Sequence, residues 1–220
     1  MNSISQNNPP QTNYFVKLKF SKVQLTVLCD IYHTYWKKLM PEDYNGGAVA
    51  VVFNQNYVIP KNHYSGVHSN VRVINFYTPQ IIEILNSVFK DVMPYMSHTG
   101  NLSLIPPGEV MNPHVDRADR PPAIYFPIDG CSDLCVTDWY NMPKNIQADR
   151  QYVESTSILP TYSVAVSNNA VLYNVHEWHG VRNLSNKTRI SFGWNTRIEE
   201  NRQTYFQVID TFRNLGYLDE

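Results

Sequence analysis

The chain has 220 residues, of which 18 are basic and 19 are acidic, so its formal net charge is −1. The length allows one sizeable hydrophobic core, and no Gly/Ser-rich linker or long charged run divides it, so we expect a single domain over residues 14–220. The near-neutral charge argues against a broad electrostatic surface for nucleic acid or for an anionic membrane.

The N-terminal segment 1–13 is polar and contains two consecutive prolines, so we expect a disordered tail. It lacks the basic and then apolar run of a signal peptide, and no stretch of the chain has the apolar length of a membrane span. We therefore expect a cytoplasmic protein. The three cysteines are an odd number without C-x-x-C spacing, which predicts free thiols rather than disulfides or a thiolate zinc site.

The first part of the chain mixes strands with helices. Alternating apolar and polar residues over 14–20 predict a half-buried strand. Ser21 and Gln24 have the spacing of a capping box before a helix over 22–40, and a second helix, begun by a proline, is expected over 79–93. The other elements expected here are a strand over 46–53, an aromatic loop over 55–70 and a strand over 71–77.

From about residue 99 the chain becomes a series of short β-type runs separated by turns. Eight such runs predict a closed or sandwiched antiparallel β-fold. Helices followed by these strands predict a mainly β (α+β) protein, with a jelly-roll core over about 99–197 and the N-terminal helices bracing one side. A terminal helix is expected within 201–218. The predicted strands cover 99–105, 109–116, 123–128, 133–140, 163–168, 170–176, 180–184 and 188–196.

The second of these strands contains His114 and Asp116, two residues apart. Side chains at i and i+2 of a strand point to the same side, so the imidazole and the carboxylate share one space. One H-x-D tripeptide is a common chance occurrence in a chain with seven histidines, so a third partner is needed. Two histidines and one carboxylate bind Fe(II) and leave positions open for oxygen chemistry. The candidates for the third ligand are His179 and His176.

Ten residues after His179 stands Arg189, followed by Ser191 on the same strand face. A guanidinium fork and a hydroxyl can together hold a carboxylate. We expect a hairpin through residues 182–188 to bring this anion clamp alongside the metal ligands. The spacing to the arginine favours His179 over His176 as the third ligand.

Together these residues resemble the Fe(II)/2-oxoglutarate-dependent dioxygenase family. The segment HGVRNLSNKTRIS is similar to the family's H-x-V-x-N-x-S-x-x-x-R-x-S pattern, and PPGEVMNPHVD resembles the Pro-Gly turn before its first metal histidine. The likeness covers about residues 99–197 and implies a double-stranded β-helix. It also implies that Fe(II) is bound by His114, Asp116 and His179. The distal carboxylate of 2-oxoglutarate would be bound by Arg189 and Ser191.

The resemblance implies an activity as well. Members of the family use O2 to hydroxylate an unactivated C–H bond while 2-oxoglutarate is decarboxylated to succinate. We expect the substrate to be a free amino acid, a peptidyl residue or a small metabolite. The sequence leaves the oligomeric state open, and the long connection over 139–162 fits either an active-site cover or a plain surface excursion.

The chain departs from the prolyl-hydroxylase-like members of this family at two places. Many of those carry a tyrosine three residues before the glycine of the first turn, where this chain has Ile105, and many use lysine where it has Arg189. Tyr125, on the strand after the H-x-D segment, is a candidate for the missing hydroxyl contact to the cosubstrate. For Arg120 we consider binding of a substrate carboxylate, assistance to the cosubstrate, or a plain surface position.

Two hypotheses from other classes are kept beside the leading one. A non-catalytic cupin-like jelly roll would use the histidines for Zn(II) or for no metal. A cupin-type metalloenzyme would act without a cosubstrate, and the carboxylate clamp argues against it because such an enzyme has no use for the clamp. An effect of 2-oxoglutarate on thermal stability in the presence of metal separates the oxygenase from the binding module.

Overall fold

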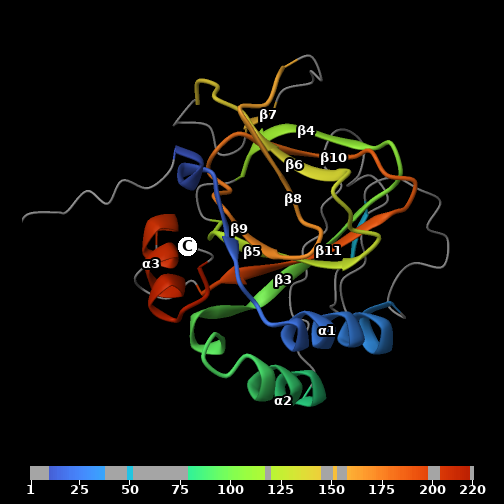
Figure 1. Cartoon of the computed structure of the whole chain (residues 1–220), viewed down its shortest axis with the longest axis vertical. Helices are drawn as coiled ribbons and strands as arrows, with labels where there is room; N and C mark the ends of the chain where they lie inside the picture. Colours follow the sequence, from blue (N-terminus) through green and yellow to red (C-terminus); the bar gives the residue numbers. More distant parts are fainter. Residues whose placement is uncertain are drawn as a thin grey trace, which may run out of the picture.

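The protein is represented by a computed structural model whose core is formed by two antiparallel β-sheets (Figure 1). Of the predicted tail, Pro10–Asn13 form a short 3-10 helix, and residues 1–9 lie outside the described part. The predicted loop 55–70 and strand 71–77 also lie outside it. The described residues are 10–37, 49–51, 79–116, 120–144, 151–152, 158–197 and 204–218.

The order of the strands defines the fold. The strands are β1 Phe15–Leu18, β2 Val49–Val51, β3 Met96–Ile105, β4 Val110–Val115, β5 Ala123–Asp129, β6 Cys135–Trp139, β7 Gln151–Tyr152, β8 Tyr162–Ala165, β9 Ala170–Tyr173, β10 His179–Asn183 and β11 Arg189–Thr196. The larger sheet has the order β1-β9-β5-β11-β3-β2, and the smaller has the order β7-β4-β10-β6-β8. From β3 to β6, and again from β8 to β11, each strand lies in the opposite sheet from the one before it. This alternation is the double-stranded β-helix form of the jelly roll, which confirms the predicted fold class.

Three α-helices among the described residues cover the larger sheet: α1 Lys22–Ile31, α2 Pro79–Val88 and α3 Tyr205–Asn214 (Figure 1). Each contributes a fully buried side chain, Leu28, Leu85 and Phe212, to one hydrophobic cluster that also contains residues of β3, β5, β9 and β11. The packing of these helices on the sheet therefore supplies most of the apolar core. In the described part of the chain, no helix has the length and hydropathy needed to cross a membrane.

The predicted helix boundaries were partly right. The Ser21–Gln24 capping box at the start of α1 is present, and in it the backbone N–H of Gln24 donates to the Ser21 hydroxyl at 3.2 Å. The single helix predicted over 22–40 instead changes to a π-helical turn over Tyr32–Trp36, and residues after 37 are outside the described part. The terminal helix is α3, which begins at a second capping box formed by Thr204 and Gln207.

Alternation along the strands of the larger sheet separates a helix-facing side from an interior side. In β11, Ile190, Phe192 and Trp194 belong to the hydrophobic cluster under the helices. Arg189 and Ser191 point the other way and line a cavity between the two sheets. Because successive side chains of a strand lie on opposite faces, apolar packing on one side of β11 fixes where the two polar side chains point.

The hairpin predicted between His179 and Arg189 was wrong. β10 pairs with β4 and β6, whereas β11 pairs with β3 and β5, so the connection crosses from one sheet to the other. Fully buried Asn183 holds this crossing, because its side-chain amide donates at 2.7 Å to the carbonyl oxygens of both Ile105 and Lys187. The clamp residues therefore face the candidate metal ligands across the interior instead of lying beside them in one sheet.

We predict that Gly130→Ala destabilises the fold far more than Gly216→Ala. Both glycines have positive φ, 60° and 78°, which costs an alanine about 1–2 kcal/mol. A Cβ at Gly216 would meet nothing within 4 Å, but at Gly130 it would lie 1.9 Å from the Thr188 carbonyl oxygen. Urea unfolding should show a loss of about 1 kcal/mol for Gly216→Ala and of roughly 3 kcal/mol for Gly130→Ala. Equal losses would contradict the tight packing of the β5–β6 turn on the connection before β11.

Candidate metal and anion site

Three predicted metal ligands converge in the interior. His114 near the end of β4 pairs in register with His179, the first residue of β10, and Asp116 follows β4 directly. One ligand atom from each of the three lies within 4.8 Å of the others. The Nε2 atoms of His114 and His179 each lie 4.0 Å from a carboxylate oxygen of Asp116. All three residues are buried, with at most 5% exposure, so the group is shielded from water.

Backbone contacts set the orientation of both imidazoles. The Nδ1 atom of His114 lies 2.9 Å from the Asn112 carbonyl oxygen, and that of His179 lies 2.8 Å from the Glu177 carbonyl oxygen. A carbonyl oxygen only accepts, so each Nδ1 carries the hydrogen and each Nε2 keeps a lone pair. Nε2 is the ring nitrogen that each histidine turns toward Asp116. This donor set fits a divalent first-row metal ion with open coordination positions, such as Fe(II).

His176, the rival third ligand, is not part of this group among the described residues. It lies in the connection between β9 and β10, where its backbone N–H donates to the Asn174 side chain at 3.3 Å. The structure therefore brings His179, rather than His176, to His114 and Asp116. The roles of these residues as ligands stay predictions.

Gly180, which follows His179, was missed at the level of sequence. The pairing of β10 with β4 shifts register between His179 and Val181, and a Cβ on Gly180 would lie 2.6 Å from the Met111 carbonyl oxygen. A glycine here allows the two backbones to approach closely enough to place His179 opposite His114. The available signal was a glycine inside a predicted strand, which often marks a bulge or a close backbone approach.

The predicted anion clamp contains a buried cation, Arg189, that has no anionic partner among the described residues. Arg189 and Ser191 are each 1% exposed, and within the described part of the chain the Nε and Nη1 atoms of Arg189 and the hydroxyl of Ser191 have no hydrogen-bond partner. The remaining terminal nitrogen of Arg189, Nη2, donates to the Tyr173 hydroxyl at 3.5 Å. An unpaired buried guanidinium is costly, and a bound carboxylate would satisfy its free donors. The observed atoms therefore fit an anionic ligand.

The clamp and the metal-ligand histidines line one small cavity. Its lining is mixed in character: the imidazoles and Arg189 lie together with aromatic and apolar side chains. The lining includes His114, His179, Arg189, Ser191, Tyr125 and Tyr173.

Tyr173 is a further polar residue of the cavity wall. Tyr173 stacks on Tyr125, with ring centroids 4.3 Å apart, and hydrogen-bonds the Thr137 hydroxyl at 2.5 Å. Burial raises the pKa of Tyr173 above its ordinary value, although the positive charge of Arg189 opposes the shift. Tyr173 therefore keeps its hydroxyl proton at neutral pH. Neither Tyr173 nor Thr137 was predicted, because each sits in an ordinary β-type run with no motif of its own.

Arg120 does not occupy a surface position. Its Nη1 donates to Oδ2 of Asp116, and its Nη2 donates at 3.0 Å to the Tyr125 hydroxyl. The side chain of Arg120 is 9% exposed and that of Asp116 is 2% exposed. Both donors are therefore engaged inside the protein, next to the metal-ligand group.

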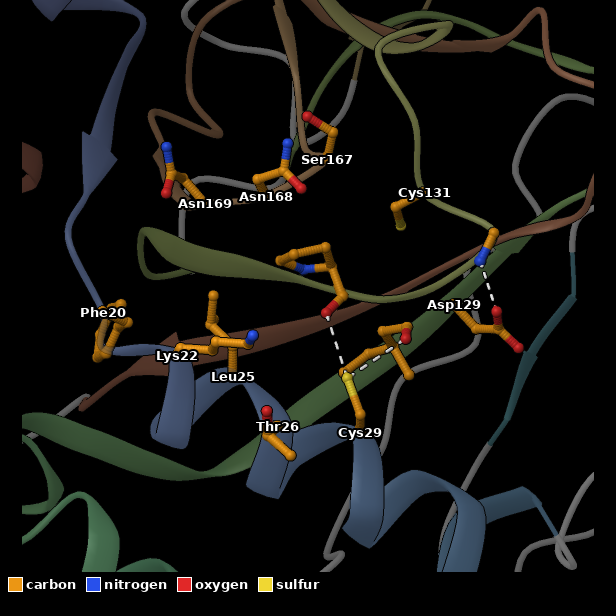
Figure 2. Close-up of a pocket in the computed structure, with 13 residues that line it drawn as sticks. Phe20, Lys22, Leu25, Thr26, Cys29, Asp129, Cys131, Ser167, Asn168 and Asn169 are labelled. Atoms are coloured by element: carbon orange, nitrogen blue, oxygen red, sulfur yellow. Dashed lines mark hydrogen bonds between the residues drawn. The ribbon is translucent and has the colours of Figure 1, made fainter.

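An open groove next to α1 contains none of the predicted site residues (Figure 2). Lys22 and Cys29 of α1 line one side, and Asp129 and Cys131 lie across from them. Burial raises the pKa of both thiols above the ordinary value. These two cysteines and Cys135 are free thiols, as predicted.

Comparison with known proteins finds likeness at the level of structure alone. No family model matches the chain, and no curated protein matches it in sequence. It is similar to a Pseudomonas putida prolyl-4-hydroxylase, with 12% identity, a TM-score of 0.41, and coverage of 86% of this chain and 95% of the other. For E. coli ycfD the identity is 12%, the TM-score 0.46, and the coverage 95% of this chain but 57% of ycfD.

A third similar structure is the viral collagen prolyl hydroxylase vCPH from Paramecium bursaria Chlorella virus-1, in complex with 2OG. Its identity is 16% and its TM-score 0.38, with coverage of 84% of this chain and 97% of the other. At such identities the likeness concerns the fold and does not assign an activity to this chain.

We predict that Gly180→Ala weakens metal binding by displacing His179. Gly100→Ala in β3 is the matched control, because its Cβ would also lie 2.6 Å from a carbonyl oxygen, that of Gly193, in the other sheet. Both variants should lose stability. Calorimetric titration with Mn(II) should show a loss of affinity of roughly tenfold or more for Gly180→Ala alone, the size expected when the orientation of a ligand is disturbed. Equal affinities in the two variants would refute this role of Gly180.

Proposed function

We propose that this protein is an Fe(II)- and 2-oxoglutarate-dependent oxygenase that hydroxylates an unactivated C–H bond, with an amino-acid, peptidyl or other small substrate. The observation that carries the proposal is a buried His-Asp-His group whose two histidines share one cavity with a buried arginine that has no anionic partner among the residues described by the structure. A metal alone explains the first feature. A metal ion together with a cosubstrate that carries a carboxylate at its far end explains both the His-Asp-His group and the buried arginine.

The residues divide into two binding sets. His114, Asp116 and His179 would hold the metal ion, with each histidine presenting Nε2 because its Nδ1 is tied to a backbone carbonyl. Arg189 and Ser191 would hold the distal carboxylate of 2-oxoglutarate through the donors that otherwise lack partners. The Tyr125 hydroxyl lines the same cavity and is the candidate for an additional contact to the cosubstrate.

The reaction converts 2-oxoglutarate, O2 and a substrate C–H into succinate, CO2 and a C–OH group. Bound Fe(II) supplies the open coordination positions and the redox chemistry that O2 activation needs. The protein orients the cosubstrate between two fixed points and keeps water out, since the ligands and the clamp are at most 5% exposed. A strand-based scaffold holds both points rigidly, which is what precise orientation of two reactants requires.

We predict that replacing Arg189 with methionine separates stability from cosubstrate binding. Removal of a buried, unpaired charge should raise the free energy of unfolding of the ligand-free protein by about 1–3 kcal/mol. The same variant should lose the thermal stabilisation that 2-oxoglutarate confers on the wild type with Mn(II) present, which is about 2.7 kcal/mol at a hundredfold excess over Kd. Differential scanning fluorimetry measures both effects.

The wild-type result of that experiment also decides between classes of protein. If 2-oxoglutarate left the melting temperature of the Mn(II)-loaded wild type unchanged, the non-catalytic or cosubstrate-independent cupin-like alternative would stand in place of the oxygenase.

We predict that His179→Ala abolishes succinate formation, whereas His176→Ala retains it. The first variant removes one of the three converging ligand atoms, and the second changes a histidine outside the group. The assay is Fe(II)-dependent succinate production from 2-oxoglutarate, followed by mass spectrometry with pools of amino acids and peptides. A product heavier by one oxygen atom identifies the substrate, and loss of succinate in His176→Ala alone would reverse the ligand assignment.

A further inference from the structure

We propose that Thr137 is a positioning residue that donates its hydroxyl hydrogen to Tyr173 and thereby leaves the Tyr173 hydrogen for an anion held by the clamp. The inference deepens the proposed function and rests on it. Its basis is the contact between the two hydroxyl oxygens, 2.5 Å apart, which joins β6 of the smaller sheet to β9 of the larger sheet. Among the described residues that line the cavity is Tyr173, but not Thr137.

The first step of the argument concerns the direction of this hydrogen bond. Two arrangements are possible in principle, because either hydroxyl can donate to the other. Thr137 is fully buried, and within the described part of the chain the Tyr173 hydroxyl is its one hydrogen-bond partner. If Tyr173 donated, the hydrogen of Thr137 would be buried without an acceptor, which is costly. Thr137 therefore donates and Tyr173 accepts.

The second step concerns the Tyr173 hydroxyl. Its oxygen also accepts from Nη2 of Arg189 at 3.5 Å. A hydroxyl oxygen that accepts two hydrogen bonds has no lone pair left but keeps its own hydrogen. Burial raises the pKa of Tyr173, so this hydrogen stays bound at neutral pH. Toward a ligand in the cavity, the Tyr173 hydroxyl can then act only as a donor.

The third step concerns the ligand that this set of groups can take. Nε and Nη1 of Arg189 and the hydroxyl of Ser191 are buried, and they have no hydrogen-bond partner among the described residues. Together with the Tyr173 hydroxyl they offer hydrogens from four atoms. An ionised carboxylate accepts only, at about four lone-pair sites. The set therefore suits the distal carboxylate of 2-oxoglutarate, and Thr137 contributes to the affinity through Tyr173.

The test measures 2-oxoglutarate binding to the full-length, Mn(II)-loaded chain by isothermal titration calorimetry. Thr137→Val removes the hydroxyl and keeps a side chain of similar shape. We expect a loss of 2-oxoglutarate affinity of about five- to tenfold, the size of one hydrogen bond. Mn(II) affinity should stay that of the wild type, because Thr137 is not one of the three metal-ligand residues. Thr137→Ser, which retains a hydroxyl, should recover most of the 2-oxoglutarate affinity.

A double-variant cycle separates this role from packing. Since Thr137 acts through the Tyr173 hydroxyl, Thr137→Val should cause no further loss of affinity once Tyr173→Phe has removed that hydroxyl. Tyr173→Phe alone should lose at least as much 2-oxoglutarate affinity as Thr137→Val. A second ligand is 2-oxopentanoate, which has the same carbon chain without the distal carboxylate. It should bind the wild type and Thr137→Val equally.

Thr196→Val is the matched control for loss of a buried threonine hydroxyl. Thr196 of β11 is 1% exposed, and its hydroxyl donates to the Pro122 carbonyl oxygen at 2.9 Å. It is not among the described residues that line the cavity. This variant should melt at a lower temperature than the wild type while it binds 2-oxoglutarate with wild-type affinity. Melting curves show that each variant is folded.

The outcomes separate this inference from the proposed function. Wild-type 2-oxoglutarate affinity in folded Thr137→Val would overturn the role of Thr137 and leave the proposed oxygenase intact. Equal losses in Thr137→Ser and Thr137→Val, additive losses in the double variant, or an equal loss of 2-oxopentanoate affinity would refute it in the same way. If the Mn(II)-loaded wild type did not bind 2-oxoglutarate at all, the proposed function and this inference would both fail.

Discussion

The antiparallel pairing of β10 with β4 is the constraint on which the site depends. It places His179 opposite His114, and Asp116 follows β4 within reach of both imidazoles. The close approach of these strands requires Gly180, because a Cβ at this position would lie 2.6 Å from the Met111 carbonyl oxygen. Backbone carbonyls then fix the orientation of the rings. The metal-ligand geometry is therefore a consequence of strand register more than of side-chain choice.

A second consequence of strand geometry is that the two faces of the larger sheet have different roles. Residues of β11 that face the helices are large and apolar, and they secure the strand in the core. Arg189 and Ser191 face the interior, where no anionic group of the described residues pairs with them. The hydrophobic packing outside offsets the cost of keeping an uncompensated charge inside. Stability is thus given up at the place where a ligand is expected to restore it.

Side-chain contacts in the interior also link the metal-ligand group to the clamp. The Asp116 carboxylate, Arg120, the stacked pair of Tyr125 and Tyr173, and Arg189 form one continuous series of contacts. The series runs from the metal-ligand group to the clamp along β5 and β9, which are neighbours in the larger sheet. Neighbouring strands hold Tyr125, Tyr173 and Arg189, whereas Asp116 and Arg120 lie in the connection between β4 and β5. Such an arrangement suits the precise orientation of a cosubstrate held at two ends.

Local patterns in the sequence determined the short strands, the jelly-roll class and the capping box at Ser21. They also determined that His114 shares a strand face with Asp116, and Arg189 with Ser191. Each of these features depends on residues that are close together in the chain. Tertiary structure alone decided how those pieces meet. The five-residue connection between β10 and β11 can close a hairpin or cross between sheets. Asn183 selects the crossing, because its side-chain amide donates to the carbonyl oxygens of Ile105 in β3 and of Lys187 in the connection itself. The partners of Arg120 and the place of Tyr173 were equally beyond local reading. Long-range pairing is a collective property of the packed core, so residue spacing predicted which side chains share a face, but not what lies across from them.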